Sequence, residues 1–88
     1  MRTDTNAMKV RVQFYSQLRD VAGAEEMIVD VSEGATVAKL LETIYEQAPA
    51  LRSRDESILV GAGVEFVDRN YKLRSGDEIS IMPPVQGG

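Results

Sequence analysis

The chain has 88 residues and a formal net charge of −4, from 10 basic and 14 acidic side chains. It contains no histidine, no cysteine and no tryptophan. A chain of this length forms one domain, and it lacks the usual neutral-pH base, the thiol nucleophile and the ligands of iron–sulfur clusters. The net negative charge provides no basic surface for phosphate backbones or anionic lipids. We therefore expect protein partners, and neither nucleic acid nor membrane.

The apolar stretches and the chain ends predict the organisation of the chain. No apolar stretch approaches the roughly 20 residues that cross a bilayer, and the N-terminus lacks a signal pattern, so we expect a cytoplasmic protein. Residues 1–7 are polar and without pattern, which predicts a disordered leader. The folded domain is expected over residues 8–82, followed by a flexible tail over residues 83–88.

Alternating apolar residues predict two strands at the start of this domain. Residues 8–15 place Met8, Val10, Val12 and Phe14 on one face, and residues 27–32 alternate in the same way. The link between them, residues 16–22, is compatible with a helical turn and is closed by Gly23. These two strands should form a hairpin.

One main helix is expected next. Thr36 is a suitable N-cap, because its side-chain oxygen can accept an unpaired N–H of the first turn. The residues that follow at helical spacing are Val37, Leu40, Leu41, Ile44 and Ala48. Pro49 should end this helix after about three turns, since proline offers no N–H and disfavours the helical conformation of the preceding residue.

The second half of the domain predicts three more strands. Residues 52–56 form a polar link, residues 57–62 a strand, and residues 64–67 a short strand after a turn at Gly63. Residues 68–74 form a loop, and residues 78–82 a last strand with Ile79 and Ile81 inward. The order ββαβββ predicts an α+β domain of the β-grasp type, a mixed sheet with one main helix packed on one face.

The opposite face of this sheet is expected to be solvated or used for binding. The pleat sends Tyr15 and Met82 outward, and Phe66 on its short strand can join them. Two interpretations stay open from the pattern alone. Scattered exposed apolar residues are normal on protein surfaces, whereas a cluster of aromatic and methionine side chains is typical of a docking patch.

The last six residues are the most informative: Pro83, Pro84, Val85, Gln86, Gly87 and Gly88. The two prolines favour an extended backbone, and six extended residues reach about 20 Å. Because Gly87 and Gly88 carry no side chain, they fit a tunnel as narrow as a backbone and place the Gly88 carboxylate at its tip. A frayed terminus without a role is the alternative.

Four stretches together resemble the ubiquitin-like sulfur carriers, and among these the family of molybdopterin synthase small subunits. They are residues 17–23, the Thr-Val helix start at 36–37, residues 73–79 and the Pro-Pro-Val-Gln-Gly-Gly end. The last stretch is the specific one, since Leu-x-x-Gly-Asp turns recur in many ubiquitin-like proteins. The resemblance spans residues 8–88 and departs at Ala62-Gly63, where the family often has Val-Asn. Glycine can adopt the same turn as asparagine.

The resemblance implies a ubiquitin-like fold and a chemistry located at Gly88. An adenylating enzyme similar to ubiquitin-activating enzymes would use ATP to form an acyl-adenylate, and sulfur would then replace AMP to give a C-terminal thiocarboxylate. The large synthase subunit would catalyse transfer of this sulfur to the pterin precursor, which forms the molybdopterin dithiolene.

In this scheme the chain itself would be a carrier and not an enzyme, with no bound cofactor and no metal. The resemblance further implies that Tyr15, Phe66 and Met82 dock on partners, and it suggests a heterotetramer of two carriers and two large subunits.

Three other functions remain open at this point. The activated Gly88 could be joined to lysine amines, as in a ubiquitin-like protein modifier. The chain could also carry sulfur for thiamin or cysteine synthesis, or it could be a plain β-grasp interaction module whose tail has no role.

Overall fold

Five strands form one mixed sheet in the order β2-β1-β5-β3-β4. The computed structural model describes residues 7–84. The strands are β1 (Ala7–Phe14), β2 (Glu26–Ser32), β3 (Leu59–Ala62), β4 (Glu65–Val67) and β5 (Glu78–Met82). Strand β5 runs parallel to β1, and the other neighbouring strands are antiparallel. The sheet is therefore mixed, as predicted.

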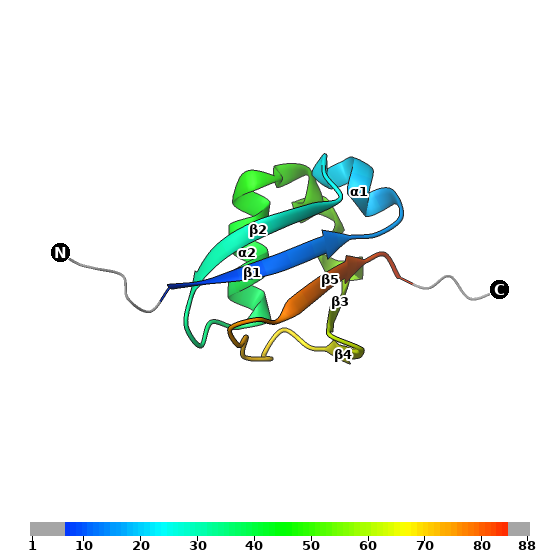
Figure 1. Cartoon of the computed structure of the whole chain (residues 1–88). Coiled ribbons are helices and arrows are strands. Elements are labelled where there is room, and N and C mark those ends of the chain that lie inside the picture. Colours follow the sequence, from blue (N-terminus) through cyan, green and yellow to red (C-terminus); the bar gives the residue numbers. More distant parts are fainter. Residues whose placement is uncertain (1–6, 85–88) are drawn as a thin grey trace.

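Three helical segments connect these strands: α1 (Gln17–Ala22), α2 (Val37–Gln47) and the 3-10 helix η1 (Pro49–Ser57). Figure 1 looks onto one face of the sheet and shows α2 crossing behind the other. The predicted α+β architecture, with one main helix on one sheet face, is confirmed. None of the helices within residues 7–84 is long and apolar enough to cross a membrane.

The hydrophobic core lies between α2 and the inner face of the sheet. Strand β1 alternates as its sequence predicts, and its inward side chains are Met8, Val10, Val12 and Phe14. The helix contributes Val37, Leu40, Leu41 and Ile44, and β5 contributes Ile79 and Ile81. Burial of these apolar side chains is the main force that holds the two layers together.

The start of α2 is held by both a side chain and a loop. Thr36 Oγ1 accepts a hydrogen bond from the N–H of Lys39 at 3.3 Å, as the N-cap prediction requires. The N–H groups of Val37 and Ala38 donate to the carbonyl oxygens of Tyr71 and Arg69, each at 3.0 Å. The loop before β5 therefore satisfies first-turn donors that a helix cannot pair by itself.

Several boundaries differ from the sequence prediction. Residues 52–56 were expected as a polar link, but they belong to η1, which the buried side chain of Leu51 anchors to the core. The predicted strand over residues 57–62 is shorter at its start because Ser57 still belongs to η1. Strand β1 begins at Ala7, one residue before the expected start, since Ala7 pairs with Ser32. Strand β4 begins one residue later than expected.

The turn between β3 and β4 tests the one departure from the family pattern. Gly63 has a φ of 63°, a left-handed conformation that glycine adopts without steric cost. Its N–H donates to the carbonyl oxygen of Glu78 at 3.0 Å. The prediction that glycine supports this turn in place of asparagine is confirmed.

Replacing Leu41 with alanine should lower the free energy of unfolding by about 2 to 5 kcal/mol, because the substitution leaves a cavity in the core. Leu41 is only 1% exposed. Urea denaturation measures the change. Glu46→Ala on the exposed side of the same helix is the control, with an expected change within about 0.5 kcal/mol. A neutral Leu41→Ala variant would contradict the orientation of α2.

Candidate functional site

The outer face of the sheet carries an open apolar hollow next to the end of β5. Its volume is about 230 Å³, and its lining includes Tyr15, Phe66 and Met82. Phe66 is 69% exposed and Tyr15 42% exposed. The structure thus brings together the three apolar residues that the sequence placed on this face. The hollow is completed by Gly61, Gly63, Val64, Glu65 and Ser80.

Strand pairing explains why these residues meet. Gly61 lies opposite Ser80 on β5 and opposite Phe66 on β4, so all three side-chain positions share the outer face. Met82 lies one pleat further along β5, on the same face as Ser80. The sequence could not identify Gly61, Val64 and Glu65 as lining residues, because the register of β3, β4 and β5 had to be known first.

Tyr15 is fixed at the end of β1 by two hydrogen bonds. Its N–H donates to the carbonyl oxygen of Ile81 at 3.1 Å, which ties the end of β1 to the end of β5. Its hydroxyl donates to Gln13 Oε1 at 3.0 Å. The next residue, Ser16, has a φ of 53°, a conformation that is costly for a residue with a side chain. The chain therefore turns sharply after Tyr15 and leaves its ring beside the hollow.

The predicted tail begins at the edge of this hollow. Pro83 follows Met82 directly and is half-buried, and Pro84 is exposed. The remaining tail residues predicted to carry the chemistry lie outside the described residues: Val85, Gln86, Gly87 and Gly88. The hollow and the start of the tail thus form one continuous surface.

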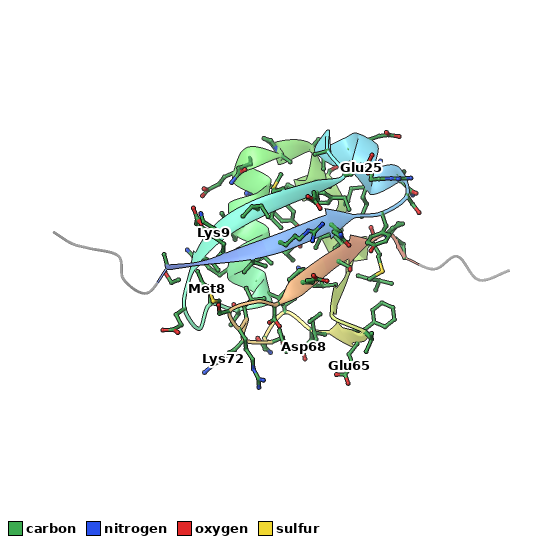
Figure 2. The ribbon with its side chains drawn as sticks, viewed as in Figure 1. Met8, Lys9, Glu25, Glu65, Asp68 and Lys72 are labelled. Atoms are coloured by element: carbon green, nitrogen blue, oxygen red, sulfur yellow. The ribbon has the colours of Figure 1, made fainter. Side chains whose placement is uncertain are left out.

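The β1–β2 part of the outer face is mainly polar, with Ile28 exposed among its charged side chains. Lys9 pairs with Asp30 at 3.0 Å, and Arg11 pairs with Glu26 at 2.9 Å. The hydrogen bond and the charge of Glu26 raise the pKa of the Arg11 guanidinium. Figure 2 shows Lys9 on the β2 side of this face and Glu65 at the β4 edge. Exposed ion pairs of this kind add little stability. They join β1 to β2, on the side of the sheet away from β4.

The largest pKa shift belongs to Tyr45. This residue lies in a different cluster, which joins α2, η1 and the loop after β4. The Tyr45 hydroxyl donates to the Asp55 carboxylate, and Arg69 contacts the same carboxylate at 3.1 Å. Burial, together with the bond to Asp55, raises the pKa of Tyr45 well above its ordinary value. The Tyr45 and Arg69 contacts lower the pKa of Asp55.

This cluster is a clamp between packed elements and not an acid–base site. Arg69 also donates to the Asp55 carbonyl oxygen at 2.7 Å, and Arg52 lies over the Tyr45 ring at 5.2 Å from its centroid. Each of these contacts joins two different elements of the fold. No group of three His, Cys, Asp or Glu side chains that could hold a metal ion occurs within residues 7–84.

Comparison with known proteins identifies the family. The sequence model of the ThiS family matches residues 12–88, which include both the hollow and the tail. The chain belongs to the ThiS family. The resemblance to sulfur carriers that the sequence predicted is therefore confirmed at the level of the family.

Three known proteins are similar to this ThiS-family chain over most of its length. The molybdopterin synthase sulfur carrier subunit of Chlamydomonas reinhardtii is 34% identical over 83 residues, which cover 92% of this chain and 100% of that protein. The crystal structure of small archaeal modifier protein 1 from Haloferax volcanii is 30% identical, with a TM-score of 0.81 over 89% of this chain and 99% of that one.

The third is a protein–protein complex of subunits 1 and 2 of the molybdopterin-converting factor from Helicobacter pylori. The matching chain of that complex is 26% identical, with a TM-score of 0.66 over 92% of this chain and 100% of that one. A protein with this fold thus occurs in a complex with a second subunit.

Replacing Tyr45 with phenylalanine should lower the free energy of unfolding by about 1 kcal/mol near neutral pH, because a hydrogen bond to a partly exposed carboxylate is lost. The pKa of Tyr45 is raised by folding, so its contribution is full below about pH 10, the ordinary tyrosine pKa, and is lost as the pH rises further. The pKa of Asp55 is lowered by folding, so its contribution is present above about pH 4 and is lost in acid.

Urea denaturation of both proteins between pH 3 and pH 11, roughly the range that spans the two ordinary pKa values, measures this effect. The difference between wild type and Tyr45→Phe should shrink at both ends of the range. Parallel stability profiles would contradict the assigned clamp.

Proposed function

We propose that this ThiS-family protein is the sulfur carrier subunit of a molybdopterin synthase. The observation that carries the proposal is the family match that runs through Gly88, together with a curated sulfur carrier subunit that aligns over its whole length. The structure supports it further, because the start of the tail and an apolar hollow share one surface. A hollow lined by aromatic and methionine side chains, beside the start of the tail, suits a protein that docks and presents its terminus.

The proposed chemistry takes place at the Gly88 carboxylate. A carboxylate is a poor electrophile, so an E1-like adenylating enzyme transfers AMP from ATP to one carboxylate oxygen and releases pyrophosphate. A sulfur nucleophile supplied to that enzyme then attacks the acyl carbon and displaces AMP, which leaves a thiocarboxylate. ATP is the substrate of the activating enzyme, and this chain holds no cofactor of its own.

The large synthase subunit then consumes the thiocarboxylate. Sulfur from Gly88 is transferred to the pterin precursor in the pocket of that subunit, and Gly88 returns to a carboxylate by hydrolysis. The residues of this chain bind and position, and the catalytic side chains belong to the partners. This division of labour explains why a chain without histidine and cysteine can take part in the reaction.

The assembly we propose is a heterotetramer of two carriers and two large subunits, located in the cytoplasm. The Helicobacter pylori complex of two converting-factor subunits supports a large-subunit partner.

A second function is favoured by one comparison. The small archaeal modifier protein 1 of Haloferax volcanii has a very similar structure, and a protein modifier needs the same activated terminus. In that case the acyl-adenylate at Gly88 is passed to a lysine amine of a target protein and forms an isopeptide bond. The two functions differ only in what attacks the activated carbon.

Adding one alanine after Gly88 should abolish formation of the thiocarboxylate, because the activated carboxylate is then no longer at the glycine. Intact mass spectrometry after incubation with ATP, the activating enzyme and a sulfur source measures the exchange of oxygen for sulfur. A single alanine added before Met1 is the matched control and should leave the reaction intact.

Sulfur incorporation into the lengthened chain would overturn the proposed carrier function. Recovery of Gly88 only in isopeptide linkage would favour the modifier. Both variants should keep the melting temperature of the wild type, since the described core residues all lie between Met8 and Ile81.

Phe66→Ala should weaken binding of the large subunit about tenfold, since an exposed aromatic side chain in the docking surface is removed. Isothermal titration calorimetry measures the affinity. Ile28→Ala is the control, because Ile28 is also exposed, at 54%, but lies on β2 away from the hollow. Equal affinities of the two variants would contradict the role of the hollow.

A further inference from the structure

Gly61 has no conformational reason to be glycine. Its φ lies outside the left-handed region, unlike that of Gly63 in the following turn. It is buried in the middle of β3 and pairs with neighbours on both sides, Phe66 on β4 and Ser80 on β5. Glycine in a strand interior weakens the strand, since it has no side chain to pack and a flexible backbone in the unfolded state. The reason for this residue must therefore lie in the space around it.

That space is the floor of the apolar hollow. A Cβ atom at Gly61 would lie 3.3 Å from Met82 Cε, 3.6 Å from the carbonyl oxygen of Glu65 and 3.8 Å from Ser80 Cβ. The tightest of these neighbours is the far end of a flexible side chain. A Cβ atom at this position would press on the end of the Met82 side chain, which can move, and would occupy part of the hollow.

The hollow has the size and chemistry of a site for one side chain. Its volume of about 230 Å³ is below the roughly 300 to 1,000 Å³ of small-molecule sites. Its walls are mainly the apolar side chains of Tyr15, Phe66 and Met82. Glu65 contributes its backbone carbonyl oxygen, which lies near Gly61. A complementary partner therefore offers an apolar side chain.

The position of the tail indicates which protein would occupy the hollow. Pro83 follows Met82 directly, and residues 83–88 reach about 20 Å when extended. A protein that receives Gly88 in a buried pocket must therefore lie close to the hollow. Under the proposed function that protein is the large subunit of the synthase.

We propose that Gly61 is a specificity-determining residue, which keeps the hollow deep enough to hold one protruding aliphatic side chain of the large subunit. The proposal rests on the proposed function, because it takes the large subunit as the occupant. Gly61 touches no reacting atom, so its effect is on binding.

The test measures binding of the large subunit from the same organism by isothermal titration calorimetry. Gly61→Val should weaken binding at least about tenfold and Gly61→Ala by a smaller factor, because each added group fills more of the hollow. Ile28→Ala is the control on the same sheet face and should stay within about twofold.

A double-mutant cycle separates an effect on the hollow from a general effect on β3. In a Met82→Ala background the side chain that Gly61→Ala displaces is absent, so adding Gly61→Ala should cost less affinity than in the wild type. Additive effects would overturn the proposal. The melting temperatures of Gly61→Val and Gly61→Ala should equal or exceed that of the wild type, because valine and alanine suit a strand better than glycine.

The remaining outcomes are distinct. Tight binding of the wild type together with equally tight binding of Gly61→Val overturns the role of Gly61 and leaves the proposed function standing. A large fall in the melting temperature of both Gly61 variants also overturns it, since glycine would then serve the fold. Failure of the wild type to bind the large subunit overturns the proposed function, and this proposal with it.

Discussion

The parallel pairing of β5 with β1 is the constraint on which the rest of the structure depends. It inserts the last strand of the domain between the first strand and β3, with Val12 opposite Ile79 and Phe14 opposite Ile81. A parallel neighbour cannot be reached by a tight turn, so the chain between β1 and β5 has to cross one face of the sheet, and α2 lies in that crossover. The core, the central position of β5 and the exit of the tail all follow from this pairing.

The same pairing explains why the candidate site lies at one end of the sheet. Parallel strands end at the same edge, so the end of β1 and the end of β5 meet at the bond between the Tyr15 N–H and the Ile81 carbonyl oxygen. Tyr15 reaches the outer face there, and Met82 and Pro83 follow from β5. The apolar hollow and the start of the tail are thereby brought together by two strands that are distant in the sequence.

The two faces of the sheet differ in what they contact. The inner face is closed by α2 and η1 and has no buried polar or charged side chain among the described residues. The outer face combines surface ion pairs near β2 with the apolar hollow near β4. In the proposed function the inner face only keeps the domain folded, and the outer face together with the tail performs the binding. A carrier whose reactive group is its own terminus needs no more than this.

Patterns within single elements were readable from the sequence. The alternation in residues 8–14, the Thr36 cap and the inward positions of Ile79 and Ile81 each depend on short-range periodicity, and the structure confirms them. The β-grasp architecture followed because one helix can cover only one face of a sheet. The helix η1 was missed, because residues 52–56 are polar and their placement depends on the buried Leu51.

The sequence by itself determined the fold class and the outward direction of Tyr15, Phe66 and Met82, and it predicted which end of the chain would carry the proposed chemistry. It did so because backbone periodicity, proline and terminal glycine act locally. Only the tertiary structure decided that these three side chains share one hollow, that Gly61 forms its floor and that Asp55 joins Tyr45 to Arg69. Those contacts depend on strand register and on the packing of distant segments, which no local pattern encodes.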